Sequence, residues 1–450
     1  MLNRFFSKRV FSLGVLTLAM AVFAEPPVTL AGAIRESMSK SEEALILQEK
    51  RKKFAAIKQD AWSGGLPQIT ANASAGRGAV TFDPSSVGFK DTTNPNKILN
   101  ITQDRYVWDV EVQQSIFSFG RLGQAIHVAG IQERADDASR KRALQQLQLT
   151  VLDAYYAVVN SRARLQTLEA SVKRAHETQA FLESNFKMGS GVRSNVLRAL
   201  TALKALEPER IRAGRDAQAA TMALNRILGR DVDAPLELDT TVHLDFPVMA
   251  AAPDSQTIHS VLEDRSDLKS LELNKQSLMG QAKYLRMQYL PALGAQAKYG
   301  ITAYELSQLG DIKNNHEWQI GVGLRWPLFD GFSFSAKAKQ IESEARSLDL
   351  TARQMRKFTQ VEIESAYREY QAADSAQVAA EQAVSAAQEA QAMMSEEFRA
   401  GKGVLTDLLG VEQSLREASL GVLGARYASV RSKAALRLAL GKDLINEEAP

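Results

Sequence analysis

The segment from residue 317 to residue 328 alternates between apolar and polar side chains with almost no error. Its apolar positions are Trp318, Ile320, Val322, Leu324, Trp326 and Leu328, and between them lie Gln319, Gly321, Gly323 and Arg325. A period of two predicts a β-strand with one apolar and one polar face. Residues 68–75, 108–113 and 293–299 alternate in the same way, so we expect four two-faced strands. Their polar faces carry the charges of Asp109, Glu111, Lys298 and Arg325.

The segments that follow the second and fourth strands predict two very long helices. Residues 122–187 and 333–399 contain no proline, and a helix of that length spans ~100 Å. Apolar residues recur in the first at the steps of a coiled coil, and a line of alanines does so in the second. These positions are Val151, Tyr155, Val158, Leu165, Leu168 and Val172, and then Ala372, Ala376, Ala379, Ala383, Ala386 and Ala390. Charges are spread along both helices, so we expect them in water.

The chain contains an internal duplication. A shift of 212 residues places Phe117 on Phe329 and Asp231 on Asp443, together with the segments between them. A shift of 224 residues places Pro67 on Pro291. The difference means that the first copy carries twelve extra residues, and we expect them in a polar loop within residues 77–105.

Each copy is predicted to run helix, strand, loop, strand, long helix, turn and return helix. Residues 25–231 form the first repeat and 257–443 the second, with 232–256 as the linker and 444–450 as the tail. Proline disfavours helix in the residue before it and donates no ladder bond, so it marks strand junctions. We expect such junctions at Pro67, Pro291 and Pro327, whereas the first copy has Ser115 in place of Pro327.

Two glycine pairs mark the turns between the long helices and the return helices. They are Gly189 with Gly191 and Gly401 with Gly403, and Ser194 and Thr406 follow near the next helix starts. The segments follow no strand and lack the GK[ST] ending of a phosphate loop. We expect Gly191 and Gly403 to end the helices.

The N-terminal residues 1–24 have the layout of a cleaved secretory signal peptide. An N-terminal membrane helix is the alternative, but the apolar run falls short of the ~20 residues that a span needs. The chain has 55 basic and 52 acidic residues, and removing a leader with three basic and no acidic residues leaves 52 of each. This balance suggests no nucleic-acid surface, and the absence of cysteine excludes disulfides and a lipidated N-terminal cysteine.

Counting the strands predicts an assembly. Taken alone, one alternating strand favours the half-buried strand of a soluble sheet, but four of them in two matching hairpins favour a membrane β-barrel. Four strands cannot close a barrel, and an open edge is not viable in lipid, so copies must share it. Two copies would give eight strands and a plugged interior, and three would give twelve strands and a channel. A coiled-coil rod is the other alternative, but it leaves the hairpins unexplained.

The chain resembles the TolC family of outer-membrane export channels. The resemblance rests on the doubled strand pairs, on "SIFSFGR" and "PLFDGFS", and on "FKMGSGVRSNVL" and "FRAGKGVLTDLL", and it covers the chain from about residue 27 to residue 443. It implies a mainly α fold with a membrane β-barrel, twelve-stranded in a homotrimer, in the outer membrane, and a periplasmic helical tunnel. It also implies docking of a periplasmic adaptor and an inner-membrane pump at the tunnel tip. Residues 231–256 and the tail look like the family's equatorial collar.

The resemblance places the tip at residues 186–197 and 398–409. The family often narrows this tip with acidic residues, and Asp407 matches the first such position, while Gly410 stands at the second and Asn195 aligns with Asp407. The adaptor is expected at the turns, which carry Gly189, Gly191, Arg193, Ser194, Gly401, Gly403 and Thr406.

We find no catalytic motif and no shared metal-ligand spacing among the five histidines, His127, His176, His243, His259 and His316. We expect no enzyme, no cofactor, no metal and no nucleic acid, and outer-membrane lipid around the strands. The predicted function is an export duct of an efflux pump or type I secretion system. The alternative is a barrel-anchored helical surface protein without transport, and the sequence does not distinguish the cargoes of a duct.

Overall fold

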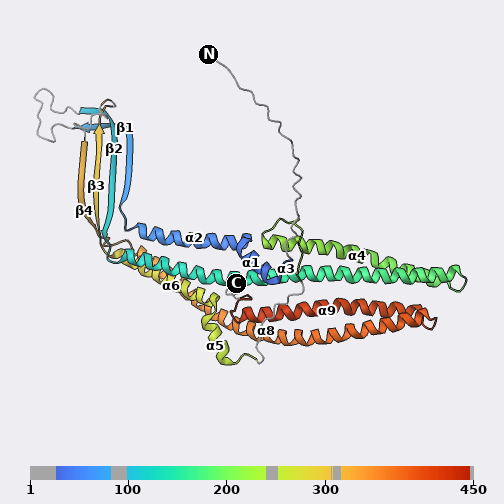
Figure 1. The fold of residues 1–450 in the computed structure, drawn as a ribbon. Coiled ribbons are helices and arrows are strands. Elements are labelled where there is room, and N and C mark those ends of the chain that lie inside the picture. The colour runs from blue at the N-terminus through green and yellow to red at the C-terminus, as the bar shows by residue number, and fades with distance from the viewer. Residues whose placement is uncertain (1–26, 83–98, 240–251, 306, 308–315, 446–450) are drawn as a thin grey trace, which may run out of the picture.

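The sheet and the long helices extend in different directions from one junction (Figure 1). The computed structural model describes residues 27–82, 99–239, 252–305, 307 and 316–445. The predicted leader and His243 lie outside these residues. The mainly helical fold predicted from the sequence is confirmed, with four strands at one end of the described part. Among the helices described, none is both long enough and apolar enough to cross a membrane.

The four strands form one antiparallel sheet in the order β1-β2-β3-β4. Their bounds are β1 (Gln68–Phe82), β2 (Leu99–Phe117), β3 (Ala292–Ala303) and β4 (His316–Arg325). Each repeat supplies one hairpin, and β2 pairs with β3 across the two repeats. The polar loop expected at residues 77–105 is shorter than predicted, because β1 continues to Phe82 and β2 already begins at Leu99. A bidentate pair from Arg77 to Asp104 joins these extensions, with Nε–Oδ1 2.6 Å and Nη2–Oδ2 3.1 Å.

The long helices repeat with the predicted shift of 212 residues. They are α3 (Arg121–Lys187) and α8 (Ser333–Arg399), and their return helices are α4 (Arg193–Leu228) and α9 (Leu405–Ala439). Shorter helices precede the hairpins, namely α1 (Leu30–Lys40), α2 (Glu42–Ser63), α5 (Ser255–Asp264), α6 (Ser266–Arg286) and the 3-10 turn η2 (Met287–Tyr289). The two helical hairpins run side by side, and their turns lie at the end farthest from the sheet (Figure 1).

The main hydrophobic core lies where α1, α3, α4 and the end of α9 meet. The apolar stripe predicted on α3 contributes Val151, Tyr155 and Val158 to this core, and Leu168 of the same stripe is buried outside it. The Tyr155 hydroxyl donates to the carbonyl oxygen of Asp239 at 2.7 Å. This bond fixes the start of the inter-repeat segment, whose Leu238 also bridges to Val28. The described start of the segment, up to Asp239, therefore packs against the middle of the helical body.

The alanine seam predicted on α8 is not the face that packs within the chain. All six predicted alanines are exposed, while the neighbouring heptad stripe is buried or half-buried. That stripe consists of Ala373, Gln377, Ala380, Val384, Ala387, Gln391, Met394 and Phe398. Packing of this stripe is favoured because Val384, Met394 and Phe398 bury more apolar surface than alanine does. The coiled-coil period is therefore correct, but the face that packs within the chain lies one residue away from the predicted one.

A buried charge cluster joins the elements midway along the molecule. The Arg265 side chain, only 2% exposed, contacts Glu362 on α8 at 2.6 Å and Asp267 on α6 at 3.0 Å. Arg142 on α3 contacts the same two carboxylates, at 3.5 Å and 3.6 Å. Arg265 also donates to the carbonyl of Ala439 at the end of α9. Guanidinium groups at a helix C-terminus satisfy its last carbonyls and favour its dipole, so the cluster holds four helices together.

Candidate channel-forming surfaces

The first candidate surface is the apolar face of the sheet. The strand register aligns apolar side chains across all four strands. One row contains Ile69, Val112, Ala297 and Ile320, and the next contains Ala71, Val110, Tyr299 and Trp318. This face is open: Ile320 is 75% exposed and Trp318 67%. A continuous exposed apolar face of this kind is typical of a surface that contacts a membrane or another protein.

The opposite face of the sheet is polar and holds the charges predicted from the sequence. Asp109 and Lys298, which lie on neighbouring strands, form an ion pair of 3.1 Å. Asn72 donates a second bond to Asp109 at 3.0 Å. Glu111 stands opposite Lys298 in the register, whereas Arg325 lies on the same face at the helical end of β4. The sheet therefore brings three of the four predicted charges together and leaves Arg325 apart.

The junction between strands and helices follows the predicted prolines. Pro67 and Pro291 directly precede β1 and β3, and Pro327 follows β4. In the first copy, where Ser115 replaces proline, β2 continues through a bulge to Phe117. Beyond Pro327, the Asp330 carboxylate accepts from the backbone N–H of Phe334 at 2.7 Å and so caps α8.

An exposed apolar rim surrounds this junction. The aromatic rings form two edge-to-face pairs, Phe117 with Phe119 and Phe329 with Phe332. The rim also contains the exposed side chains of Trp62, Leu66, Trp326 and Leu328. Aromatic side chains with one wet and one apolar side are typical of a membrane–water interface.

The second candidate surface is the pair of turns at the far end. The prediction that Gly191 and Gly403 end the helices is wrong. Gly189 and Gly401 adopt the left-handed conformation after the last turn, with φ of 80° and 74°. Gly191 has another role, because a Cβ there would lie 2.8 Å from the Phe186 backbone nitrogen. Both glycines of each pair are therefore needed, the first for its conformation and the second for close approach.

Other residues predicted at the tip lie within these turns or directly after them. Ser194 and Thr406 lie in the first turns of α4 and α9, but Val192 and Val404 occupy the capping positions without side-chain bonds. Arg193 is exposed at the start of α4.

The residues predicted to narrow the tip follow on the return helices. Asp407 is exposed and accepts a 3.4 Å bond from Thr406, Asn195 is half-buried and Gly410 is exposed. A small core of Leu182, Ala199 and Leu405 joins the two hairpins next to the turns. This core brings the segments of Asn195 and Asp407 to one end of the molecule.

The sequence analysis missed a polar contact between the hairpins. Glu412 on α9 pairs with Arg174 on α3 at 2.7 Å and accepts from Gln391 on α8 at 2.8 Å. These side chains line a cavity of about 320 Å³. The duplication held a signal, because the equivalent positions are Ala386 for Arg174 and Leu200 for Glu412. Neither Arg174 nor Glu412 has a charged counterpart in the other repeat, which fits a contact between the two repeats rather than one that each repeat makes within itself.

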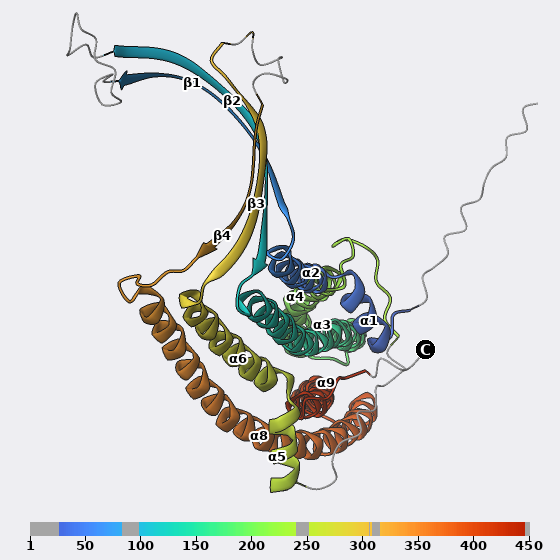
Figure 2. The same ribbon diagram turned by 90° about the vertical axis from the view of Figure 1, so that its left-hand side faces the viewer.

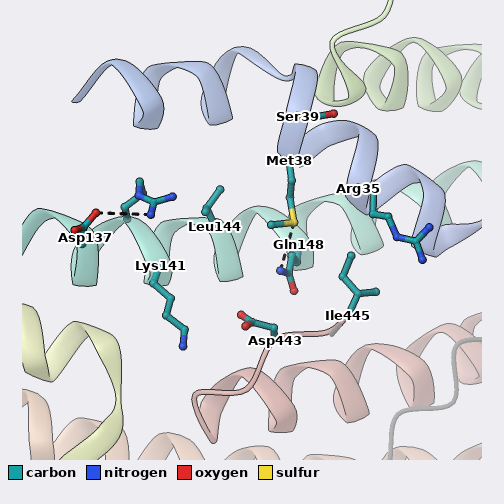
Figure 3. A pocket seen from close by; sticks show the side chains of 10 residues that line it. Arg35, Met38, Ser39, Asp137, Lys141, Leu144, Gln148, Asp443 and Ile445 are labelled. Atoms are coloured by element: carbon teal, nitrogen blue, oxygen red, sulfur yellow. Dashed lines mark hydrogen bonds and ion pairs between the residues drawn. The ribbon is translucent and has the colours of Figure 1, made fainter. Parts of the chain in front are cut away.

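A larger cavity of about 480 Å³ lies midway along the molecule, between α1, α3 and the segment after α9 (Figure 3). Asp137 pairs with Arg140 at one side, and Gln148 donates to the Met38 sulfur at 3.6 Å. Asp443 and Lys141 bring further charges of both signs to its wall. Among the residues placed by the structure, no cluster of three His, Asp or Glu side chains could hold a metal ion.

Comparison with known proteins defines the class. The sequence model of the family described as "Outer membrane efflux protein" matches residues 47–230 and 257–442, one match for each repeat. The chain therefore belongs to this outer-membrane efflux protein family.

Two curated relatives extend the comparison. The alkaline protease secretion protein AprF of Pseudomonas aeruginosa is 25% identical over 75% of this chain and 70% of its own length. The outer membrane protein TolC of Vibrio cholerae is 22% identical over 94% of this chain and 92% of its own length. The resemblance to the TolC family is confirmed.

Solved structures show the same fold. The outer membrane channel CmeC of Campylobacter jejuni superposes with a TM-score of 0.75 at 14% identity, covering 98% of this chain and 94% of CmeC. The outer membrane protein VceC of Vibrio cholerae gives 0.71 at 19% identity, covering 92% and 97% of the two chains. The mainly helical, internally duplicated fold is thus shared with outer-membrane channels.

Proposed function

We propose that this protein is the outer-membrane duct of a tripartite export system. The observation that carries the proposal is the sheet with one apolar and one polar face, attached to two long helical hairpins. The apolar face meets lipid, the polar face lines a water-filled lumen, and the hairpins extend the passage through the periplasm. Membership of the outer-membrane efflux protein family supports both the location and the transport role.

The proposed assembly is a homotrimer. The sheet of one chain ends in two open edges, β1 and β4, and unpaired backbone groups are costly in hydrocarbon. Three chains give a closed barrel of twelve strands with room for a lumen. The lumen-facing charges are then Asp109, Glu111, Lys298 and Arg325.

The turns at the tip are the proposed contact with a periplasmic adaptor and an inner-membrane pump. The exposed side chains there include Met188, Val192 and Val404, with Arg193 beside them. The pump selects the cargo. The family description supports an efflux pump, and the name of AprF, an alkaline protease secretion protein, supports a secretion system.

Conductance across a planar bilayer tests the duct. The purified protein is expected to conduct ions, and Asp407→Ala is expected to raise the single-channel conductance and to weaken block by multivalent cations. Both effects follow from removing the carboxylate proposed to narrow the tip. Glu369→Ala, which removes an exposed charge from the middle of α8 and far from the tip, is the matched control and should conduct as the wild type does.

Two outcomes separate the parts of this proposal. If the wild type conducts but Asp407→Ala leaves conductance and cation block unchanged, the duct stands and the role of Asp407 is wrong. If neither protein conducts, the sheet only anchors a helical surface protein, which is the alternative predicted from the sequence.

A further inference from the structure

The two repeats do not bury equivalent surfaces. Helix α6 lies between α3 and α8, whereas its counterpart α2 lies beside α3 at the edge of the row (Figure 2). Accordingly α6 buries Leu268, Ser270, Ser277 and Ala282, but α2 buries only Ala44. One long face of α2 is therefore open in the single chain.

One interface of α6 has an equivalent within the chain. Lys275 on α6 pairs with Asp349 on α8 at 2.8 Å, and the repeat shifts carry this pair onto Arg51 and Asp137, which lie 3.7 Å apart. The contact of α2 with α3 is thus the counterpart of the contact of α6 with α8. The duplication preserves this packing in both copies.

The other interface of α6, with α3, has no equivalent within the chain. There Ser270 donates to the carbonyl of Ala135 at 3.1 Å, and the α3 positions Val128, Ile131 and Ala135 are buried. The repeat shifts carry them onto Gln340, Ser343 and Ser347 of α8, and carry Ser270 onto Ile46 of α2. All four counterparts are exposed, Ile46 by 56%. The surfaces of α6 and α3 that pack together within the chain therefore have counterparts on α2 and α8 that are both exposed, one at each end of the row of helices.

We infer that α2 of one subunit packs against α8 of a second copy of this chain, with Ile46 opposite Ser347 of the partner subunit. The sheet shows the same relation. Strand β2 pairs with β3 within the chain, and their counterparts in the other repeat, β4 and β1, are the two open edges of the sheet. The pair Val110–Tyr299 maps onto Val322 opposite Ala75 of the partner subunit. The inference rests on the proposed shared assembly and adds its register.

The charges on the two open faces complement one another. Lys50 and Lys53, which lie on the same side of α2 as Ile46, replace Asn274 and Ser277 of α6. On α8, the exposed Glu344 replaces Gln132 of α3. Because the helices run antiparallel, moving from Ile46 to Lys50 on α2 corresponds to moving from Ser347 back to Glu344 on α8. Lysines and a carboxylate that exist only on the open faces thus meet in this register.

Disulfide trapping tests the register directly, because the chain has no cysteine of its own. Ile46→Cys combined with Ser347→Cys is oxidised in outer membranes and separated by denaturing, non-reducing electrophoresis. We expect covalent oligomers up to the trimer, at roughly tenfold higher yield than with either single variant, because only matched Cβ atoms reach disulfide distance. Both residues are exposed in the single chain, so the exchanges leave its core unchanged.

A displaced pair provides the control. Ile46→Cys with Ser365→Cys moves the second thiol by ~27 Å along α8 and should stay monomeric on the gel. A native mass of three chains without trapping of the Ile46–Ser347 pair would overturn the register while the shared duct stands. A native mass of one chain for the wild type would overturn both. Equal trapping of the displaced pair would also overturn the register.

Discussion

At the residue scale, single polar contacts join elements that are distant in sequence. Glu36 on α1 forms a bidentate pair with Arg230, at the end of α4, with distances of 2.9 Å and 2.7 Å. Lys40 adds a third contact at 3.2 Å. Burial alone would raise the pKa of the Glu36 carboxyl, but the bonds and charges of Arg230 and Lys40 outweigh it and lower the pKa below its usual value of 4.5.

This lowered pKa makes the fold sensitive to acid. A carboxylate whose pKa is lower in the folded state stabilises the fold above pH 4.5, and that contribution is lost as the pH falls through the folded pKa. We expect Glu36→Gln to reduce the free energy of unfolding at pH 7 by about 1 to 2 kcal/mol and to flatten its decline below pH 4.5. Chemical denaturation in detergent, followed by circular dichroism, measures both.

The control for Glu36 is Glu49→Gln, which removes a carboxylate from the exposed pair with Lys52. Exposed pairs contribute little, so its free energy of unfolding should change by less than about 0.5 kcal/mol. Equal losses in the two variants would contradict the assigned role of Glu36.

The side-chain contacts between distant elements were the part of the structure that the sequence predicted least well. No local pattern indicates that Arg174 meets Glu412, or that Arg265 meets Glu362, because each pair joins elements far apart in sequence. The strand charges were predictable, because alternation alone places Asp109 and Lys298 on the polar face. Their direct pairing needed the register between strands.

At the element scale, periodicity predicted the elements better than their boundaries and faces. The bounds of α8 are those predicted for it, residues 333–399, and the side chains of the strands alternate between the two faces of the sheet as expected. The face of α8 that packs within the chain lies one residue away from the predicted alanine seam. Alanine occupies two adjacent stripes, and only packing against α9 shows which of them is used within the chain. The helix-ending glycine was also misplaced, because two glycines per turn satisfy the same sequence signal.

The turn glycines give a prediction at this scale. Gly401→Ala places a side chain at φ 74° and should destabilise the α8–α9 hairpin by about 1 kcal/mol. Gly403→Ala should also destabilise it, because its Cβ would lie 3.0 Å from the Phe398 backbone nitrogen. Thermal unfolding followed by circular dichroism compares the variants.

Gly410→Ala is the matched control for the turn. Gly410 lies inside α9 with open space around its Cβ position, so alanine should leave the unfolding temperature unchanged or raise it. A loss of stability in this variant equal to that of Gly401→Ala would show that the turn conformation is not the cause.

At the scale of the whole molecule, the proposed assembly makes the chain one segment of a closed ring. Its sheet has two open edges, and its helical row ends in open faces on α2 and α8, whose counterparts α6 and α3 pack against each other within the chain. The duplication was visible in the sequence, and with it the need for further copies. The residues that meet across the seam were not, because they follow only once the structure shows how α6 packs on α3.

The native mass of the protein, extracted from outer membranes in mild detergent, tests the central claim most directly. We predict a mass of three mature chains after the detergent is accounted for, because twelve strands close the sheet and leave a lumen. A stable particle of one chain would contradict the account, since four strands with open edges cannot form a membrane duct.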